Sequence, residues 1–247
     1  MKSIIISGIC GKTGANVYES AKESGLNVAC GIDREYYGNF DCPVYQSFAD
    51  VNEYADVVVD FSSPSNLTGL LQYCVENKTP VVIATTGYSA EEEIKITEAA
   101  SIIPILKASN LSLGVNFFAK IVGETAGVLD EYDVEIIERH HRYKKDAPSG
   151  TTKMIVEAIK KSRAISLLSY GRKDDKPRKD GEIGIHSVRG GSVVGEHEVC
   201  FYGKYDEIRL IHSAQNKKLF SDGAIKAALF IAEQQPGFYT EKDLYNF

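Results

Sequence analysis

The stretch "SIIISGICGKTGANVYESAKES", residues 3–24, decides the fold. Three consecutive isoleucines run into a loop that contains Gly8, Gly11 and Gly14, and a helical pattern follows directly. An apolar strand, a glycine loop and a helix in this order are typical of the first unit of a dinucleotide-binding fold. There the N–H groups at the helix start bind the pyrophosphate. The alternative is a tight strand–helix turn without a ligand.

Asp33 follows the next predicted strand, "NVACGI", and stands 19 residues beyond Gly14. A carboxylate at this place can accept hydrogen bonds from the ribose hydroxyls of an adenosine. Arg34 comes next, and an arginine there can hold a 2′-phosphate that Asp33 would repel. The pair therefore leaves the choice between NADH and NADPH open, and Arg34 can equally be a solvated surface cation.

The remaining pattern predicts an α/β chain with two domains. Up to residue 110, Val/Ile runs alternate with helical segments, which indicates a parallel sheet buried on both faces. Residues 111–129 then form a long amphipathic pattern, and "EIGIHSVRGGSVVGEHEVCFYG" with "DEIRLIHSA" predicts antiparallel strands joined by glycine-rich turns. We expect a Rossmann-like dinucleotide-binding domain over residues 1–110 plus about 217–247. A second α+β domain with a mixed or antiparallel sheet, for substrate binding and oligomerisation, should span 111–216.

Composition narrows the class of protein. The 247 residues carry a net charge of −6, which argues against a general nucleic-acid binder. Five cysteines without a CxxC pair are expected to be reduced thiols, as in a cytoplasmic protein. No apolar run approaches the length of a membrane span, and the N-terminus lacks a signal-peptide core. We expect a cytoplasmic protein with neither a membrane nor a nucleic-acid partner.

The stretch "ERHHRYKKDAPSGTT", residues 138–152, concentrates polar chemistry. Adjacent histidines on a strand point to opposite faces, and no cysteine lies nearby, so we expect no metal site. A serine hydrolase would need a G-x-S-x-G elbow, which "APSGT" does not supply. Ser149 can instead cap a helix, so that the N–H groups of Gly150 and Thr151 bind a carboxylate or phosphate. With Lys144 and a histidine as proton donor, this predicts hydride transfer onto a small anionic substrate.

At these residues the sequence resembles the 4-hydroxy-tetrahydrodipicolinate reductase family, also called the dihydrodipicolinate reductase family. Residues 138–151 are similar to its signature E-x-H-H-x-x-K-x-D-A-P-S-G-T. The resemblance covers essentially the whole chain, through "GICGKTG", "VVVDFSSP", "IATTG", "ASNLSLGVN", "VRGGSVVGEHEVCF" and "FSDGAIKAALF". It implies reduction of 4-hydroxy-tetrahydrodipicolinate to tetrahydrodipicolinate, with loss of water and with NADH or NADPH as hydride donor, in lysine and diaminopimelate biosynthesis.

The resemblance also implies roles for individual residues. His140 would be the general acid, with Lys144 assisting. The carboxylates of a small dicarboxylate substrate would be bound by His141, Ser149, Gly150 and Thr151. The cofactor would be bound by Gly8, Ile9, Cys10, Gly11, Lys12, Thr13, Asp33, Arg34, Ala84, Thr85, Thr86, Ala108, Ser109, Asn110 and Leu111. Family members are usually homotetramers built through the sheet of the second domain, so we expect a homotetramer.

Some positions depart from the family pattern. Ala84 stands where glycine is usual, Leu111 where phenylalanine is common, and Lys217 where an arginine is frequent. Two other functions remain open: a non-catalytic NAD(H)-binding regulator, and another two-domain dehydrogenase of an amino-acid pathway. A regulator would need Gly8 and Asp33 but not His140 with Lys144, so turnover of a substrate separates these possibilities.

Overall fold

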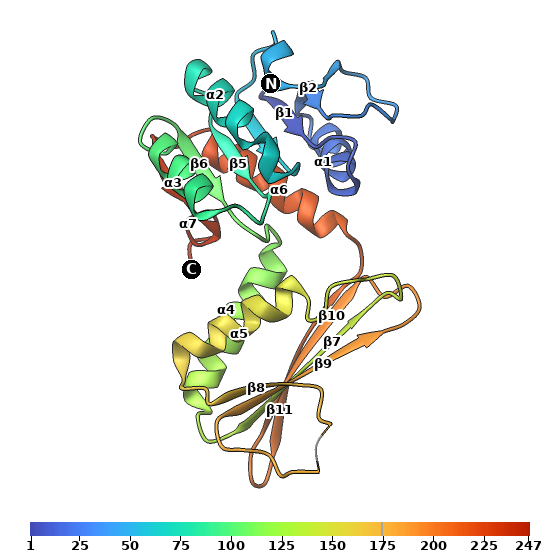
Figure 1. Cartoon of the computed structure of the whole chain (residues 1–247), viewed down its shortest axis with the longest axis vertical. Helices are drawn as coiled ribbons and strands as arrows, with labels where there is room; N and C mark the ends of the chain where they lie inside the picture. Colours follow the sequence, from blue (N-terminus) through green and yellow to red (C-terminus); the bar gives the residue numbers. More distant parts are fainter. Residues whose placement is uncertain (174) are drawn as a thin grey trace. The chain divides into compact units, whose positions relative to one another are not determined.

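A computed structural model describes residues 1–173 and 175–247, which form two compact units. Unit 1 comprises Met1–Leu113 and Lys218–Phe247, and unit 2 comprises Gly114–Lys217. Helix α6 (Lys218–Ile231), which follows unit 2 in the sequence, therefore packs with the N-terminal residues, and Figure 1 shows it in orange-red beside the blue and green elements of unit 1. In the described parts of the chain, no helix is long and apolar enough to cross a membrane.

Unit 1 contains a seven-stranded parallel sheet in the order β12-β6-β5-β4-β1-β2-β3. Parallel pairing brings the carboxyl ends of all strands to one edge, which is where ligands bind in open α/β sheets. The predicted Rossmann-like fold is thus confirmed. The strands are β1 (Ser3–Ser7), β2 (Asn27–Ile32), β3 (Val44–Tyr45), β4 (Val57–Asp60), β5 (Val81–Ile83), β6 (Pro104–Lys107) and β12 (Gly237–Tyr239).

Helices cover both faces of this sheet, which explains the continuous isoleucine run of β1. Ile4 and Ile6 pack with α1 and α6 in one core cluster, whereas Ile5 packs with α2 and α3 in another. All three isoleucines are fully buried, so the middle of the strand is apolar on both faces of the sheet. The helices are α1 (Lys12–Glu23), α2 (Leu67–Asn77), α3 (Ala90–Ala99), α6 and α7 (Glu241–Tyr245), with short 3₁₀ turns at Phe48–Asp50 and Pro64–Asn66.

Unit 2 contains a five-stranded mixed sheet in the order β11-β10-β7-β9-β8. Helices α4 (Leu113–Val128) and α5 (Gly150–Ser162) contribute Val122 and Ile159 to a core with Ile136 of β7. Figure 1 shows these two helices side by side next to the sheet. The strands are β7 (Asp133–His140), β8 (Leu167–Tyr170), β9 (Glu182–Arg189), β10 (Gly195–Tyr202) and β11 (Glu207–Ala214).

The predicted antiparallel pairing is confirmed for β10 with β11, but the expectation that β9 and β10 are neighbours is wrong. β7 lies between them, antiparallel to β10 and parallel to β9. The glycine-rich connection is held to the end of β7 instead: the Gly190 N–H donates to the His140 carbonyl at 3.0 Å, and the Arg142 N–H donates to the Gly191 carbonyl at 3.2 Å. The apolar alternation of a strand fixes which face is buried but not which strand lies beside it. The observed register places Arg189 directly opposite His140.

Candidate active site

The glycine loop of unit 1 is too tightly packed to hold side chains at two of its glycines. Gly8 follows β1 with φ of +79°, and a Cβ there would lie 2.6 Å from the carbonyl oxygen of Phe61. A Cβ on Gly14 would lie 2.0 Å from the carbonyl oxygen of Gly8. The loop can therefore bend sharply, and α1 can begin close to the strand end. Backbone N–H groups at such a helix start form an anion site that fits the pyrophosphate of a dinucleotide.

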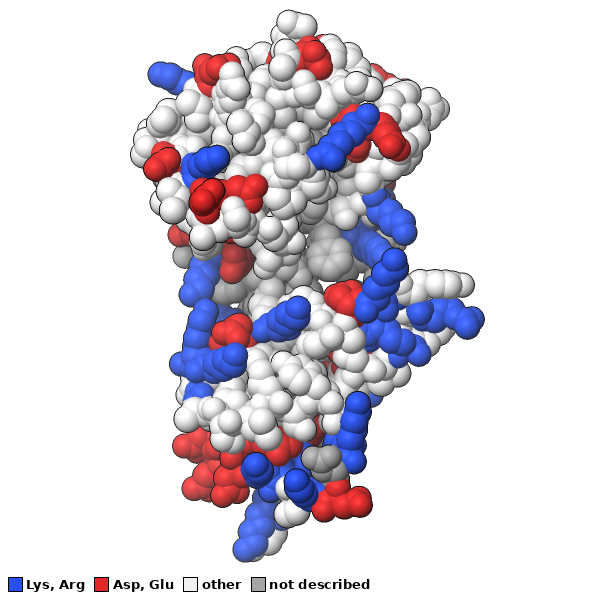
Figure 2. All heavy atoms as spheres, viewed as in Figure 1, with Lys and Arg blue, Asp and Glu red and all other residues white. Residues whose placement is uncertain are grey.

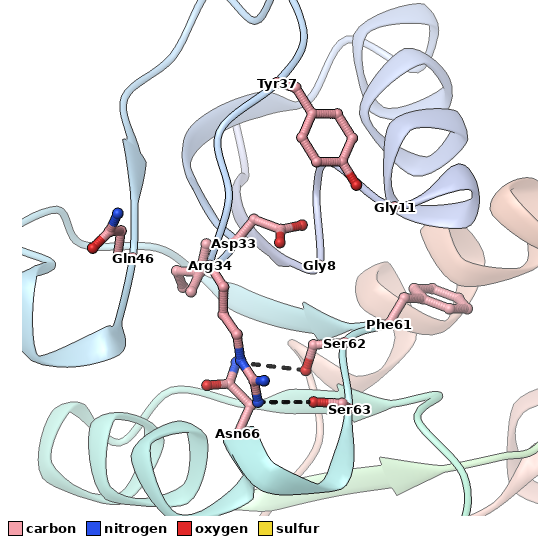
Figure 3. A pocket seen from close by; sticks show the side chains of 11 residues that line it. Gly8, Gly11, Asp33, Arg34, Tyr37, Gln46, Phe61, Ser62, Ser63 and Asn66 are labelled. Carbon is pink, nitrogen blue, oxygen red and sulfur yellow. Dashed lines mark hydrogen bonds between the residues drawn. The ribbon is translucent and has the colours of Figure 1, made fainter.

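A hollow beside this loop contains the other predicted contacts for the adenosine half of a cofactor (Figure 3). Asp33 follows β2, and its carboxylate accepts a hydrogen bond from the Cys10 N–H at 2.9 Å. The carboxylate thus fixes the glycine loop and still lines the hollow. The Arg34 guanidinium donates to the hydroxyls of Ser63, at 3.4 Å, and Ser65. Figure 3 shows Arg34 reaching from the end of β2 toward Ser63.

The structure brings only some of the predicted cofactor residues to this hollow. Gly8, Gly11, Asp33 and Arg34 line it, whereas the side chains of Ile9 and Cys10 are buried. Lys12 and Thr13 lie in the first turn of α1 and are not among the lining residues. The lining residues that we did not predict are Ile32, Tyr37, Gln46, Phe61, Ser62, Ser63 and Asn66. The serines after β4 could have been predicted as lining residues, because they too follow a strand of the parallel sheet.

A second hollow of unit 1 contains four of the seven predicted nicotinamide-side residues. Thr85, Thr86, Ala108 and Ser109 line it together with Gly87, Lys107, Phe238 and Glu241. Ala84, Asn110 and Leu111 are not among the lining residues, and Leu111 instead accepts a hydrogen bond from Tyr245 through its carbonyl oxygen. The nearly inaccessible Asp60 accepts from the Thr85 hydroxyl at 2.6 Å. This carboxylate therefore holds the turn after β5 in place.

His140 is the last residue of β7 and lies in a buried polar cluster of unit 2. Its Nδ1 contacts the carboxylate of Glu138, which is fully buried. The other carboxylate oxygen of Glu138 accepts from the Arg189 guanidinium at 2.7 Å. Burial lowers the pKa of His140 and Glu138 raises it, and the balance lies below the ordinary value of 6.5. A bound anion would favour the protonated imidazolium, which is the form that a proton donor needs.

His197 of β10 is the second histidine of this cluster, rather than His141. Its ring lies edge-on to that of His140 with centroids 5.2 Å apart, and its Nε2 lies 2.9 Å from the Ser149 hydroxyl oxygen. Burial lowers the pKa of His197 to about 4, so this ring is neutral near pH 7. Sequence reasoning did not assign His197 a role, because only the sheet register brings it to the end of β7.

Glu138, His140 and His197 offer ligand atoms within 4.8 Å of one another, which raises the question of a metal. One carboxylate oxygen of Glu138 already contacts the His140 Nδ1, and the other accepts from Arg189. A cation would have to displace these donors and sit beside a guanidinium, which is electrostatically unfavourable. The donor set does not suit a metal, and the expectation that none is bound stays a prediction.

The turn before α5 has the geometry predicted for a helix cap. The Ser149 hydroxyl oxygen accepts from the Thr152 N–H at 3.2 Å, which leaves the N–H groups of the first turn available near Gly150 and Thr151. Lys144 pairs with Asp146 at 2.8 Å, so Asp146 helps to fix the loop. His141 follows the strand and is half-buried; in the described structure its Nδ1 has no hydrogen-bond partner.

Lys and Arg side chains gather on unit 2 in the face drawn in Figure 2. Within 142–153 the exposed cations are Arg142, Lys145 and Lys153, and Lys144 is half-buried. This local positive charge contrasts with the overall charge of −6. A field of one sign near a site raises the local concentration of substrates of the opposite sign. The surroundings of the turn thus suit an anionic ligand.

A Rossmann-type unit with a glycine loop, joined to a mixed-sheet unit with a histidine–lysine cluster, defines the class of two-unit nicotinamide-dependent oxidoreductases. The comparisons identify the family within this class. Residues 2–111 match the family model "Dihydrodipicolinate reductase, N-terminus", and residues 114–245 match "Dihydrodipicolinate reductase, C-terminus". The chain belongs to the dihydrodipicolinate reductase family.

Curated relatives match over nearly the full length of both chains. The 4-hydroxy-tetrahydrodipicolinate reductase of Caldanaerobacter subterraneus subsp. tengcongensis is 46% identical, over 99% of this chain and 98% of the relative. That of Alkaliphilus oremlandii is 44% identical, over 98% of each. The solved structure of dipicolinate-bound dihydrodipicolinate reductase from Paenisporosarcina sp. TG-14 has the same fold, with a TM-score of 0.81, 24% identity and 98% coverage of each chain.

Proposed function

We propose that this protein reduces 4-hydroxy-tetrahydrodipicolinate to tetrahydrodipicolinate, with loss of water, in lysine and diaminopimelate biosynthesis. The substrate gains one hydride and one proton, and NADH or NADPH is oxidised. The observation that carries the proposal is full-length membership of the reductase family together with the buried His140 and the capped turn before α5. A non-catalytic NAD(H)-binding regulator would have no use for this cluster.

His140 is proposed to donate the proton and Lys144 to assist. Hydride transfer onto an unsaturated imine increases the electron density of the substrate, and a protonated imidazole can neutralise it. The dicarboxylate itself helps, because its negative charge opposes the effect of burial that lowers the pKa of His140. Lys144 is held by Asp146 at 2.8 Å and can hold a carboxylate or deliver a second proton.

The substrate carboxylates are proposed to bind His141, Ser149, Gly150 and Thr151. The hydroxyl of Ser149 acts by capping α5, and its side chain is 2% exposed, so its contribution is to keep the turn in shape. The backbone N–H groups of Gly150 and Thr151 then face the ligand at the positive end of the helix. Dipicolinate, which is bound in the Paenisporosarcina enzyme, is a small dicarboxylate of the kind that this turn would hold.

The cofactor is proposed to bind along the carboxyl edge of the sheet of unit 1. The pyrophosphate would lie on the glycine loop, the adenosine ribose near Asp33, and a 2′-phosphate near Arg34. Thr85, Thr86, Ala108 and Ser109 would lie along the nicotinamide side. The reduced nicotinamide, when bound, supplies the hydride. Asp33 and Arg34 together suit a protein that accepts NADH as well as NADPH.

The protein is further proposed to be a cytoplasmic homotetramer assembled through the sheet of unit 2. The sheet face away from α4 and α5 presents the exposed Val188 and Ile211 beside the Arg139–Glu196 ion pair, whose atoms lie 2.7 Å apart. Apolar side chains framed by ion pairs are common in subunit interfaces. Light scattering on the purified protein tests this, with four chain masses expected and a monomer contradicting it.

Turnover tests the function directly. The substrate is generated in place from pyruvate and aspartate semialdehyde by the preceding enzyme, and loss of reduced-nicotinamide absorbance is followed with NADH and NADPH in parallel. We expect oxidation only when pyruvate, semialdehyde and the preceding enzyme are all present, with tetrahydrodipicolinate formed in equal amount. Absence of oxidation with either cofactor, from folded protein that still binds NADH, would overturn the proposed reaction.

A further inference from the structure

Two side chains of unit 2, the buried Glu138 and the half-buried Arg189, lie in a row behind the imidazole of His140. Glu138 lies two residues earlier on β7, so its side chain shares the face of His140, and it contacts Nδ1 through one oxygen. Its other oxygen accepts from the Arg189 guanidinium at 2.7 Å. Arg189 stands opposite His140 in the parallel pair of β7 and β9. The strands themselves therefore fix this arrangement, and no flexible loop is needed.

Glu138 is ionised in spite of its burial. Burial alone would raise the pKa of Glu138, but its bonds with Arg189, Ser187 and His140 lower the pKa below its usual range. An ionised carboxylate can only accept hydrogen bonds. The ring nitrogen that faces it must therefore carry a proton, which fixes the neutral His140 as the tautomer protonated at Nδ1.

The other ring nitrogen of His140, Nε2, lies beside the backbone of Gly195, which has no side chain. A Cβ on Gly195 would lie 3.1 Å from Nε2 and 3.3 Å from Cδ2. Any other residue at position 195 would press on the edge of the ring that carries Nε2. Gly195 thus leaves room next to the nitrogen that does not contact Glu138.

We propose that Glu138 and Arg189 are positioning residues that hold the His140 proton on Nδ1 and thereby make Nε2 the nitrogen that gives its proton to the substrate. This inference rests on the proposed role of His140 as proton donor. When the imidazolium loses its Nε2 proton, the ring returns to the neutral form protonated at Nδ1, and Glu138 stays ionised. No proton passes to the carboxylate in this scheme.

Arg189 also connects His140 with Lys144. The same guanidinium nitrogen that donates to Glu138 donates to the Asp146 carbonyl at 2.7 Å, and the Asp146 carboxylate holds Lys144 at 2.8 Å. One arginine therefore sets the place of both proposed proton donors.

The tautomer of His140 can be measured without turnover. The protein is labelled with ¹⁵N-histidine, the two ring nitrogens are identified from their long-range couplings to the ring protons, and the His140 signals are assigned by their loss in His140→Gln. We expect Nδ1 to be protonated in the neutral wild-type ring. A neutral ring protonated at Nε2 would overturn the proposal, and this measurement needs no Glu138 variant to fold.

Glu138→Gln then tests the consequence. The amide keeps the size of the side chain but removes its charge, so the neutral ring should shift toward the Nε2-protonated form. We expect kcat to fall by about 10–100-fold, the range that loss of an outer hydrogen-bond partner costs at metal-bound histidines. The control is Glu157→Gln, which removes the charge of an exposed carboxylate on α5 that pairs with Lys160 at 2.7 Å and lies outside the proposed interface face of the sheet.

The control should leave both the tautomer and kcat of the protein unchanged. A folded Glu138→Gln protein with wild-type tautomer and wild-type kcat would refute the positioning role. If the wild-type ring is protonated at Nδ1 but the protein does not oxidise NADH with the complete substrate mixture, the positioning geometry stands and the proposed reaction fails. The two ideas are thus tested separately.

Discussion

The glycine loop of unit 1 and the His140 cluster of unit 2 offer different kinds of group to an anionic ligand. Around the loop, the donors are backbone N–H groups, and Gly8 and Gly14 make space for them because a Cβ at either position would meet backbone atoms. Around His140, the groups are side chains, and Glu138, His140 and His197 are all nearly inaccessible to solvent. The first region can bind a charged ligand without changing its own protonation, whereas the second can exchange a proton.

This difference predicts how each region fails. A site made of backbone is broken by adding atoms, and the damage appears in folding and in cofactor binding. A site made of titratable side chains is broken by removing charge, and the damage appears in the rate and in its pH dependence. Substitutions in the two regions should therefore give effects on different measured quantities.

Lys144→Ala should have the largest effect among the variants that sharpen this comparison. If Lys144 assists proton transfer, kcat should fall by about 10²–10⁴-fold. Steady-state kinetics with the coupled substrate supply measures this, and Lys145→Ala is the control because its side chain is exposed and adjacent. A raised KM with unchanged kcat would instead assign Lys144 to substrate binding alone.

Gly14→Ala should act on folding and on the cofactor rather than on proton transfer. The new methyl group would lie 2.0 Å from the Gly8 carbonyl oxygen, so the loop or α1 must move. Overpacking of this kind costs about 1–3 kcal/mol of unfolding free energy. Denaturant unfolding and NADH titration measure the two consequences. Gly25→Ala is the comparison for Gly14→Ala. A Cβ on Gly25 would meet no atom within 4 Å, and only its φ of +71° would add backbone strain.

Arg34→Ala should separate the two cofactors. Loss of a charged hydrogen bond to a 2′-phosphate costs about 1.5–3 kcal/mol, so KM for NADPH should rise by about tenfold or more. KM for NADH should change little, because NADH has no phosphate at that place. Equal effects on both cofactors would show that Arg34 supports the hollow through Ser63 and Ser65 instead.

The smallest expected effect is a shift between the pH profiles of kcat/KM and of kcat. A proton donor must be protonated, so kcat/KM should fall as pH rises through the pKa of His140 in the free protein, which burial places below 6.5. The profile of kcat reports the substrate complex, in which the dicarboxylate raises this pKa, so its fall should come at higher pH. Coincident profiles would mean that the substrate does not act on the ionisation of His140.

Much of the fold followed from local patterns in the sequence. The isoleucine run of β1 and the valine run of β4 predicted buried parallel strands. Strands of two or three residues, such as Val44–Tyr45 and Gly237–Tyr239, are too short to show a period. The place of β7 between β9 and β10 depends on long-range pairing, which periodicity does not encode.

The candidate site was predictable to the extent that it lies in one stretch. His140, Lys144 and Ser149 fall within ten positions, and Asp33 and Arg34 follow a recognisable strand, so sequence reasoning could propose them. Arg189 and His197 come from other strands, and only the register brings them to the end of β7. Glu138 and Arg189 both lie in stretches that carry the family resemblance, but no motif shows that their side chains meet at His140.

The most direct test of the division between the two regions uses His140→Gln. NADH binding is titrated by fluorescence and turnover is measured on the same sample, with wild type beside it. The account predicts unchanged NADH affinity and a kcat lowered by about 10²–10⁴-fold. Wild-type turnover by this variant, or loss of NADH binding from a folded protein, would contradict the assignment of proton chemistry to unit 2 and cofactor binding to unit 1.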